Sequence, residues 1–210
     1  MKVLILGATG LVGRNALAQL LAQEAVTQVI APTRRPLPTQ DKLTNPVAPR
    51  LERLLPEMTN WQPDAVICAT GTTINKAGSK EAFRSVDHDL PLAFAQHAHQ
   101  QGVERFALVS AIGASADSSF FYTRVKGELE QDIQKIGFKS LTILRPGMIE
   151  GDRGEFRLAE NIALTLARSL APILPRRFHV NPASTIARAL VGAVVTGEPG
   201  CHFRYSDSLA

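Results

Sequence analysis

The stretch Gly7-Ala8-Thr9-Gly10-Leu11-Val12-Gly13 decides the fold of this chain. It follows Lys2–Leu6, a short apolar run rich in branched residues, which is typical of a strand buried on both faces. It precedes Leu11–Gln23, in which leucines recur at helical spacing. Glycines at this junction allow a sharp turn, a close approach of the backbone to a pyrophosphate, and tight packing of helix on strand. Because a helix N-terminus also attracts phosphate, all seven residues are predicted to form a dinucleotide site.

Beyond this turn, short apolar runs alternate with helical patterns. Further strands are expected at residues 29–31, 64–69, 105–109 and 141–144, and helices at 80–101 and 122–136. Such alternation is typical of βαβ units, so we predict a Rossmann-like, doubly wound parallel sheet of the α/β class. The proline-punctuated residues 36–49 are expected to form a loop that holds at most one weak strand.

The pattern changes after about residue 150. Residues 155–170 and 184–195 look helical, and residues 201–205 look like a final strand. This segment is too short for a core of its own. We therefore expect a single domain over residues 1–210, in which residues 151–200 mainly form a small helical cap at the carboxyl edge of the sheet, where open α/β sheets bind ligands.

Composition is that of an ordinary globular protein, with 210 residues, 45% of them hydrophobic and 20% charged. Cys68 and Cys201 lie far apart in the sequence, which indicates free thiols in a reducing compartment. The glycines near the N-terminus fit a strand, turn and helix better than a secretion signal, and no apolar run is long enough to span a membrane. These features predict a cytoplasmic protein that does not bind membranes.

The end of the second expected strand bears on which dinucleotide binds. It carries Thr33-Arg34-Arg35, and no carboxylate stands between Glu24 and Asp41. A carboxylate at this place would hold the ribose 2′-hydroxyl of NAD, whereas guanidinium groups can hold the 2′-phosphate of NADP. We therefore predict NADP(H) as the cofactor, bound by Arg34 and Arg35; the alternative is a solvated pair of loop arginines. This use of two arginines accounts for part of the net charge of +4, and the scattered basic residues, with no aromatic platform, argue against nucleic acid.

Tyr122 and Lys126 stand four residues apart, on one face of an expected helix. A neighbouring ammonium group favours the phenolate form of a tyrosine, so the pair is suited to proton transfer. Ser110 ends an expected strand at the carboxyl edge, where its hydroxyl can bond a substrate oxygen. Ser110, Tyr122 and Lys126 are therefore the candidate catalytic residues.

The glycine turn, Ser110, Tyr122-x-x-x-Lys126 and Leu144-Arg145-Pro146-Gly147 together resemble the short-chain dehydrogenase/reductase superfamily, in its atypical or extended branch. The resemblance runs over nearly the whole chain. A narrower resemblance to the human Tat-interacting protein-like oxidoreductases rests on Gly71-Thr72-Thr73, Lys76-Ala77-Gly78, Val86-Asp87, residues 122–128 and Arg145-Pro146-Gly147.

This resemblance implies a Rossmann fold that binds NADP(H), with Tyr122 as the proton donor, Lys126 holding the ribose and Ser110 orienting the carbonyl. It also implies that the cofactor is lined by Thr70, Gly71, Pro146 and Gly147. Many short-chain enzymes carry an asparagine on the helix after the fourth strand, where this chain offers Asp87.

The predicted function is reduction or oxidation of a small carbonyl or alcohol. One alternative is a non-catalytic NADPH-binding regulator that presents a surface to a protein partner. Another is a nucleotide-sugar epimerase, for which the expected cap is short. The sequence leaves the substrate and the oligomeric state open.

The remaining polar residues carry weaker signals. His97 and His99 point away from each other on a helix, and no His/Cys cluster or carboxylate pair suggests a metal, so none is predicted. His88 and Asp89 are expected on a solvated face, and Phe120-Phe121 beside the cleft. Four arginines of the last third have open roles, Arg153 and Arg157 being the better candidates for substrate contact than Arg176 and Arg177.

Overall fold

The computed structural model describes residues 1–150 and 180–209. Its centre is a seven-stranded sheet in the order β3-β2-β1-β4-β5-β6-β9, in which every neighbouring pair is parallel. This confirms the Rossmann-like doubly wound fold. The strands are β1 (Lys2–Leu6), β2 (Gln28–Ile30), β3 (Leu43–Thr44), β4 (Ala65–Cys68), β5 (Arg105–Val109), β6 (Ser140–Arg145) and β9 (Gly200–Tyr205).

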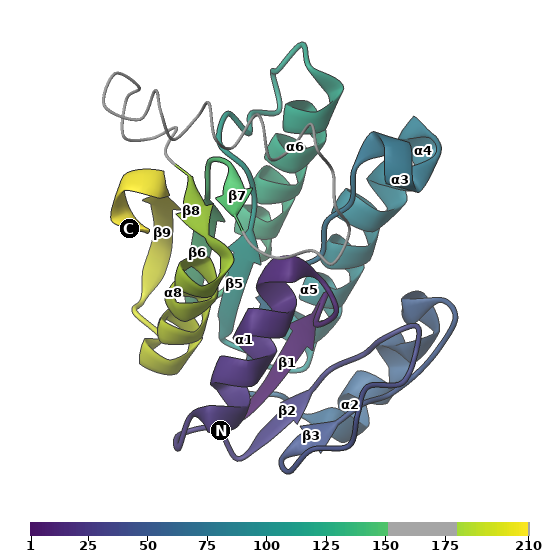
Figure 1. Ribbon diagram of the computed structural model, residues 1–210, viewed down its shortest axis with the longest axis vertical. Helices are drawn as coiled ribbons and strands as arrows, with labels where there is room; N and C mark the ends of the chain where they lie inside the picture. The colour runs from purple at the N-terminus through teal and green to yellow at the C-terminus, as the bar shows by residue number, and fades with distance from the viewer. Residues whose placement is uncertain (151–179, 210) are drawn as a thin grey trace.

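Helices cover both faces of the sheet (Figure 1). One face packs against α1 (Leu11–Ala22) and α8 (Ala183–Thr196). The other packs against α5 (Leu90–Gln100) and α6 (Phe121–Ile136), with Met58 from the short helix α2 beside them. The strands alternate accordingly: Val3 and Ile5 of β1 join the first core, and Leu4 and Leu6 join the second. The continuous apolar runs of the sequence thus reflect burial on both faces.

The segment between β2 and β4 contains more structure than its sequence indicates. The weak strand expected there is β3, which pairs with β2. It is followed by a 3₁₀ helix at Leu51–Glu57 and by α2 at Met58–Trp61. These turns were not predicted, because Pro56 and the scattered charges around it obscure a helical pattern.

The C-terminal residues differ from the expected cap. The apolar stripe of α8 packs against α1 and the sheet, and β9 extends the sheet beside β6 (Figure 1). Residues 183–200 are therefore part of the Rossmann layers, because Ile186, Leu190 and Val194 find their apolar partners there. A small two-stranded sheet joins β7 (Ile149–Glu150) to β8 (Asn181–Pro182). The rest of the expected cap, residues 151–179, lies outside the described residues.

The helix expected at residues 80–101 is continuous but changes its geometry. It consists of α4 (Lys80–Arg84), a π-helical turn at Ser85–Asp89, and α5. The prediction that His88 is solvated is wrong, since it is 5% exposed, whereas Asp89 is exposed. An i,i+4 pattern does not reveal a π turn, which inserts an extra residue and shifts the faces on which side chains lie.

Two glycines of the turn after β1 are required by close packing. Gly7 has a φ of +81°, and a Cβ atom there would lie 2.5 Å from the carbonyl oxygen of Ala69. A Cβ atom on Gly13 would lie only 1.9 Å from the carbonyl oxygen of Gly7. The contact at Gly13 brings the start of α1 directly over the end of β1, as the sequence predicts, and the contact at Gly7 brings the turn against the end of β4.

Candidate functional site

A cavity of about 430 Å³ lies where the strand order reverses between β1 and β4, at the carboxyl edge of the sheet. Open α/β sheets bind their ligands at this place. Its walls come from the start of α1, the ends of β4 and β5, the π turn, α6 and β7. The lining residues are Thr9, Gly10, Leu11, Val12, Arg14, Ala69, Thr70, Gly71, Thr72, Thr73, Lys76, Asp87, Val109, Ser110, Tyr122, Lys126 and Ile149.

The glycine turn forms the phosphate side of this cavity. Gly10 is the N-cap of α1 and makes no side-chain cap, and the first helical turn carries no acidic residue. Within the part of the chain that the structure describes, this twelve-residue helix thus presents its first N–H groups without a side-chain cap, and the helix dipole favours negative charge there. A Cβ atom on Gly10 would stand 3.3 Å from the carbonyl oxygen of Gly7. The bare backbone therefore provides a cradle that fits a pyrophosphate.

The structure brings half of the predicted cofactor residues to this cavity. Thr9, Gly10, Leu11, Val12, Thr70, Gly71 and Lys126 line the cavity. Gly7, Ala8 and Gly13 are not among the lining residues. Pro146 and Gly147 also lie outside the lining; the Gly147 N–H donates to Ser206 Oγ at 2.6 Å, and the Pro146 carbonyl accepts from Ile112 N–H at 3.0 Å. For these two residues a cofactor contact stays a prediction.

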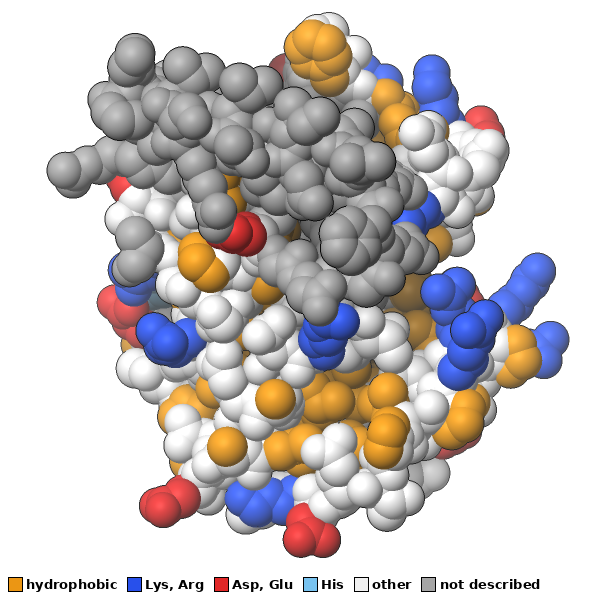
Figure 2. Space-filling model, in the orientation of Figure 1, with side chains coloured by type: hydrophobic (Ala, Val, Ile, Leu, Met, Phe, Trp, Pro, Cys, Tyr) orange, Lys and Arg blue, Asp and Glu red, His pale blue; other side chains and the backbone are white. Residues whose placement is uncertain are grey.

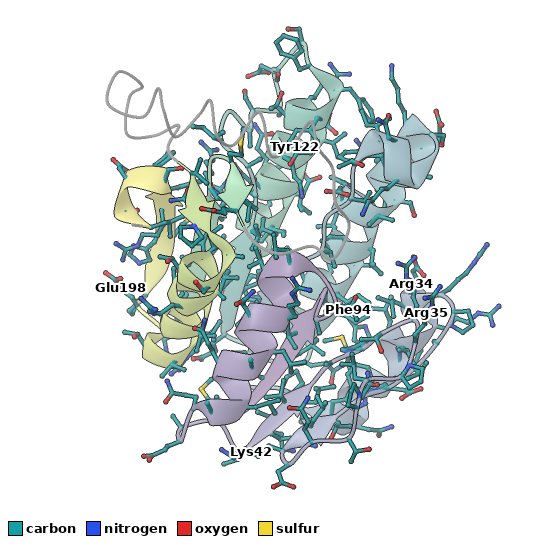
Figure 3. The ribbon with its side chains drawn as sticks, in the orientation of Figure 1. Arg34, Arg35, Lys42, Phe94, Tyr122 and Glu198 are labelled. Atoms are coloured by element: carbon teal, nitrogen blue, oxygen red, sulfur yellow. The ribbon has the colours of Figure 1, made fainter. Side chains whose placement is uncertain are left out.

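The three candidate catalytic residues face the same cavity. Ser110 follows β5 and is 5% exposed, and its Oγ has no hydrogen-bond partner among the described residues. Tyr122 lies in the first turn of α6 and is 38% exposed (Figure 3). Lys126 lies one turn further along and is 4% exposed. A buried hydroxyl without a partner, next to an accessible phenol, fits a site that awaits a ligand oxygen.

Asp87 completes this group, although the sequence did not single it out as a site residue. Its Oδ1 lies 2.7 Å from Lys126 Nζ, and its Oδ2 accepts a hydrogen bond from Thr72 N–H at 2.8 Å. Burial lowers the pKa of Lys126, but the charges of Asp87 and Tyr122 outweigh burial and raise this pKa above its usual value. Lys126 is therefore an ammonium group under all ordinary conditions. The available signal was the motif Val86-Asp87, which the resemblance had already marked.

Gly127 lets α6 approach the loop after β5. A Cβ atom at Gly127 would lie 2.1 Å from the backbone carbon of Ser115. The Ser115 N–H also donates to the Thr123 carbonyl at 3.1 Å. This close contact brings Tyr122 and Ser110 to one cavity. A glycine inside an expected helix can indicate close packing, and this signal was available in the sequence at Gly127.

Arg145, from the motif Leu144-Arg145-Pro146-Gly147, has a structural partner. Its guanidinium forms a paired contact with the buried carboxylate of Glu130 on α6 and lies 4.7 Å from the ring centre of Phe203 on β9. The hydrogen bonds that Arg145 donates to Glu130 raise the pKa of Arg145 above its usual value. The motif thus ties the end of β6 to the helix that carries Tyr122.

Arg34 and Arg35 are exposed on the loop after β2 and do not line the cavity (Figure 3). Basic side chains gather at the edge of the molecule that carries this loop (Figure 2). The exposed arginines between residues 31 and 57 are Arg34, Arg35, Arg50 and Arg53. Two cations that were not predicted as site residues, Arg14 and Lys76, line the cavity itself.

Other expected features fall outside the cavity. Phe120 is 76% exposed, and Phe121 packs on Phe83 with ring centres 5.7 Å apart; neither lines the cavity. Arg153, Arg157, Arg176 and Arg177 lie outside the described residues. Within residues 1–150 and 180–209 there is no group of three side chains suited to hold a metal ion. No helix in this part of the chain has both the length and the apolar character of a membrane span.

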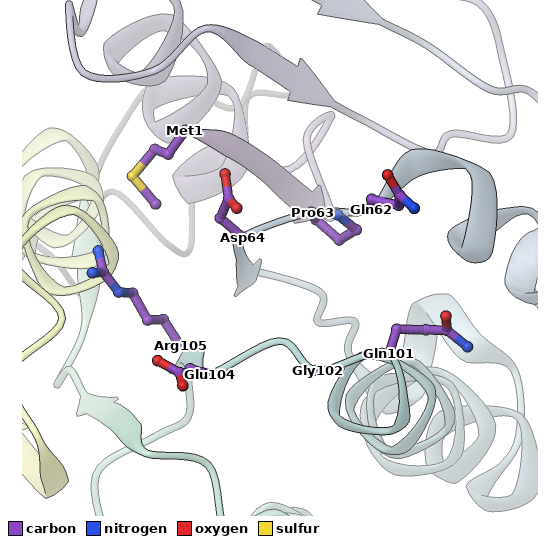
Figure 4. A pocket seen from close by; sticks show the side chains of 8 residues that line it. All are labelled: Met1, Gln62, Pro63, Asp64, Gln101, Gly102, Glu104 and Arg105. Atoms are coloured by element: carbon purple, nitrogen blue, oxygen red, sulfur yellow. The ribbon is translucent and has the colours of Figure 1, made fainter.

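A second cavity, of about 570 Å³, opens at the amino edge of the sheet (Figure 4). Charged side chains in this second cavity stabilise the fold through hydrogen bonds to the backbone. Asp64 Oδ2 accepts from the Lys2 N–H at 2.6 Å, and Arg105 donates to the carbonyl oxygens of Val194 and Val195 at 3.0 Å each. The chemical groups suited to a reaction therefore lie at the carboxyl edge.

Residues 7–165 match a family model described as NAD(P)H-binding. The chain belongs to this NAD(P)H-binding family. Among solved structures, the Bordetella bronchiseptica enzyme WbmH in complex with NAD⁺ superposes with a TM-score of 0.74 at 17% identity, covering 98% of this chain and 75% of that one. UDP-glucose 4-epimerase from Thermotoga maritima has a TM-score of 0.70 at 15% identity, covering 98% and 77%. These neighbours share the fold, and together with the NAD(P)H-binding match they are consistent with the predicted resemblance to an atypical member of the short-chain superfamily.

Curated relatives of this NAD(P)H-binding protein carry the name "Protein fmp52, mitochondrial". The protein from Emericella nidulans is 38% identical over 179 residues, which cover 82% of this chain and 77% of the relative. The protein from Saccharomyces cerevisiae is 38% identical over 156 residues, covering 73% and 68%. These names point to mitochondria, so the prediction of a cytoplasmic protein is wrong. That prediction rested on the two free thiols and on the lack of a secretion signal and of a membrane span, and none of these features excludes an organelle.

Proposed function

We propose that this protein is an NADP(H)-dependent oxidoreductase of the short-chain type that acts on a small carbonyl or alcohol. The observation that carries the proposal is the shared cavity, in which the glycine turn meets Ser110, Tyr122 and Lys126. A site for dinucleotide binding alone would need the turn. It would not need a buried serine hydroxyl that lacks a partner among the described residues and shares the cavity with an accessible phenol. The combination favours chemistry on a ligand that lies against the dinucleotide.

The residues present fit the cofactor. The bare backbone at Gly10 and the start of α1 would hold the pyrophosphate, and the Lys126 ammonium group would hold the ribose hydroxyls. When bound, NADP(H) supplies or accepts a hydride. Arg14 adds a positive charge at the phosphate side of the cavity.

In this proposal each catalytic side chain has one role. Ser110 donates a hydrogen bond to the substrate oxygen and fixes its position. Tyr122 gives a proton to that oxygen in reduction and takes it back in oxidation, as a general acid and base. Lys126 keeps its positive charge next to the phenol, which favours the negative charge that Tyr122 develops as it releases its proton.

The test of this function is a panel of small carbonyls, quinones and alcohols with NADPH or NADP⁺, followed by the nicotinamide absorbance. Turnover of at least one compound, lost when Ser110 is replaced with alanine, supports the proposal. Tight NADPH binding without turnover of any compound would favour the regulator that binds NADPH and presents a surface to a protein partner.

The arginines after β2 set the cofactor preference in this proposal. Both are exposed and free to turn toward a 2′-phosphate, and a guanidinium group binds phosphate through paired hydrogen bonds. We expect Arg34→Glu and Arg35→Glu to weaken NADPH binding by about tenfold or more and to leave NADH binding nearly unchanged, as a loss of about 1.4 kcal/mol implies. Calorimetric titrations with both dinucleotides measure this.

Arg53→Glu is the matched control, since Arg53 is an exposed arginine on the neighbouring 3₁₀ helix. It should change the two affinities equally and only slightly. If Arg53→Glu lowers NADPH affinity as much as the two test variants do, the effect is one of general charge and the assignment of the 2′-phosphate to Arg34 and Arg35 is refuted.

A further inference from the structure

The ion pair between Asp87 and Lys126 is almost fully buried, although both groups are charged. The Asp87 side chain is 0% exposed and that of Lys126 is 5% exposed, with 2.7 Å between Oδ1 and Nζ. Burying two charges costs more free energy than an exposed pair does, and removal of one partner leaves the other uncompensated. A buried ion pair at the wall of a cavity indicates that the charge of one of its members has a function in the site.

The second oxygen of Asp87 reaches a different wall of the same cavity. Asp87 Oδ2 accepts from the N–H of Thr72, in the segment that follows β4 and lines the cavity. One carboxylate thus holds both the ammonium group on α6 and the backbone after β4. The backbone at Gly71, next to Thr72, passes close to both groups: a Cβ atom there would lie at van der Waals distance, 3.7 Å from Asp87 Oδ1 and 3.9 Å from Lys126 Nζ.

The π turn at Ser85–Asp89 makes this arrangement possible. Asp87 and His88 are adjacent in sequence, and both are buried. Asp87 contacts Lys126, while His88 Nε2 lies 3.2 Å from Asp132 Oδ2, so both residues contact α6. Adjacent residues of a regular helix point about 100° apart, and the wider π turn reduces this angle, which favours contact of both side chains with the same neighbouring helix.

We propose that Asp87 is a positioning residue for Lys126, which keeps this side chain charged and fixed at the ribose side of the cavity. The proposal rests on the proposed function in one respect, because Lys126 is taken to serve the cofactor and Tyr122. Its structural part concerns the protein alone and is tested without any ligand.

The charges around Lys126 determine what the loss of Asp87 would do. The titratable groups that face it are Asp87 from the π turn, Tyr122 from α6 and Cys68 from β4. Burial lowers the pKa of Lys126, and Asp87 is the largest of the contributions that raise it. Without the carboxylate, burial dominates, and the lysine loses its proton at a lower pH.

The test is an NMR titration of the ligand-free protein labelled with ¹³C at the lysine Cε. Lys126→Arg assigns the signal by its absence. In the parent, Lys126 should stay charged up to and beyond its ordinary pKa of 10.5. In Asp87→Asn it should titrate at least about one pH unit lower than in the parent. The matched control is Asp89→Asn, the same change on the same turn at an exposed carboxylate, which should leave the Lys126 titration unchanged.

The second readout is the pH dependence of turnover. The readout is the rate of alcohol oxidation, in which Tyr122 acts as the base. This rate should fall at alkaline pH in Asp87→Asn but not in the parent, and the double variant Asp87→Asn with Lys126→Arg should lose this fall, because arginine keeps its proton. A lowered rate with the same pH profile as the parent would mean that Asp87 serves only the fold, and would overturn the proposal.

The NMR titration and the pH dependence of turnover distinguish a failure of the proposed oxidoreductase function from a failure of the proposed role of Asp87. If no compound is turned over but the Lys126 titration moves as expected, the proposed function fails and the role of Asp87 in holding the charge stands. An unchanged Lys126 titration in Asp87→Asn overturns the inference whatever the activity. If Asp87→Asn does not fold, Asp87→Ser removes the same carboxylate with less bulk and gives the same readouts.

Discussion

Tyr122→Phe should reduce turnover by about 10³-fold while NADPH binding changes by less than about twofold, since a positioned acid or base contributes about 10²–10⁴ to a rate. The substitution removes only the hydroxyl. The ring keeps its contact with Phe83, whose centre lies 5.6 Å away, so the start of α6 should stay in place. Single-turnover rates with saturating NADPH, compared with calorimetric affinities, measure the two effects separately.

The chain offers a close control for this experiment. Its other tyrosine, Tyr205, lies at the end of β9 and is 41% exposed, outside the lining of the cavity. Tyr205→Phe removes the same atom and should leave both turnover and binding unchanged. A Tyr122→Phe protein with the turnover of the parent would show that this phenol transfers no proton.

The second large effect is expected at Gly13. Replacement with alanine places a Cβ atom 1.9 Å from the carbonyl oxygen of Gly7, so α1 must move away from the turn. Backbone is less able than a flexible side chain to relieve such a contact. We expect a loss of about 3 kcal/mol of the free energy of unfolding and at least a tenfold loss of NADPH affinity. Denaturant unfolding and calorimetry measure the two losses.

Gly192→Ala is the matched control for that prediction. Gly192 lies inside α8, and a Cβ atom there meets nothing within 4 Å. Alanine is favoured over glycine in a helix interior, so this variant should be more stable by about 0.5–1 kcal/mol and should bind NADPH normally. Equal stability losses in both variants would contradict the assigned role of Gly13.

The sequence predicts the sheet well because its signals are local. Apolar runs such as Arg105–Val109 are buried on both faces, and the glycine turn fixes the junction between β1 and α1 through contacts only a few residues apart. The helix at Ala183–Thr196 was also predicted, but its partner was not. Which apolar face α8 covers depends on the sheet and α1, which lie far away in the sequence.

In the candidate site, too, the residues related by local spacing were predicted, and the contacts that depend on tertiary packing were not. Tyr122 and Lys126 are related by helical spacing, which a sequence displays directly. The contact of Asp87 with Lys126 depends on a π turn and on how α6 packs, and neither leaves a periodic pattern. Gly127 is visible as a glycine in a helix, but its close approach to Ser115 appears only in three dimensions.

The most direct test of the account is a calorimetric titration of the unmodified protein with NADPH and with NADH. We predict one site per chain and at least about tenfold tighter binding of NADPH, a difference of about 1.4 kcal/mol. Equal affinities for the two dinucleotides would contradict the assignment of Arg34 and Arg35. The absence of binding by either would contradict the central claim that the cavity at the carboxyl edge holds a dinucleotide.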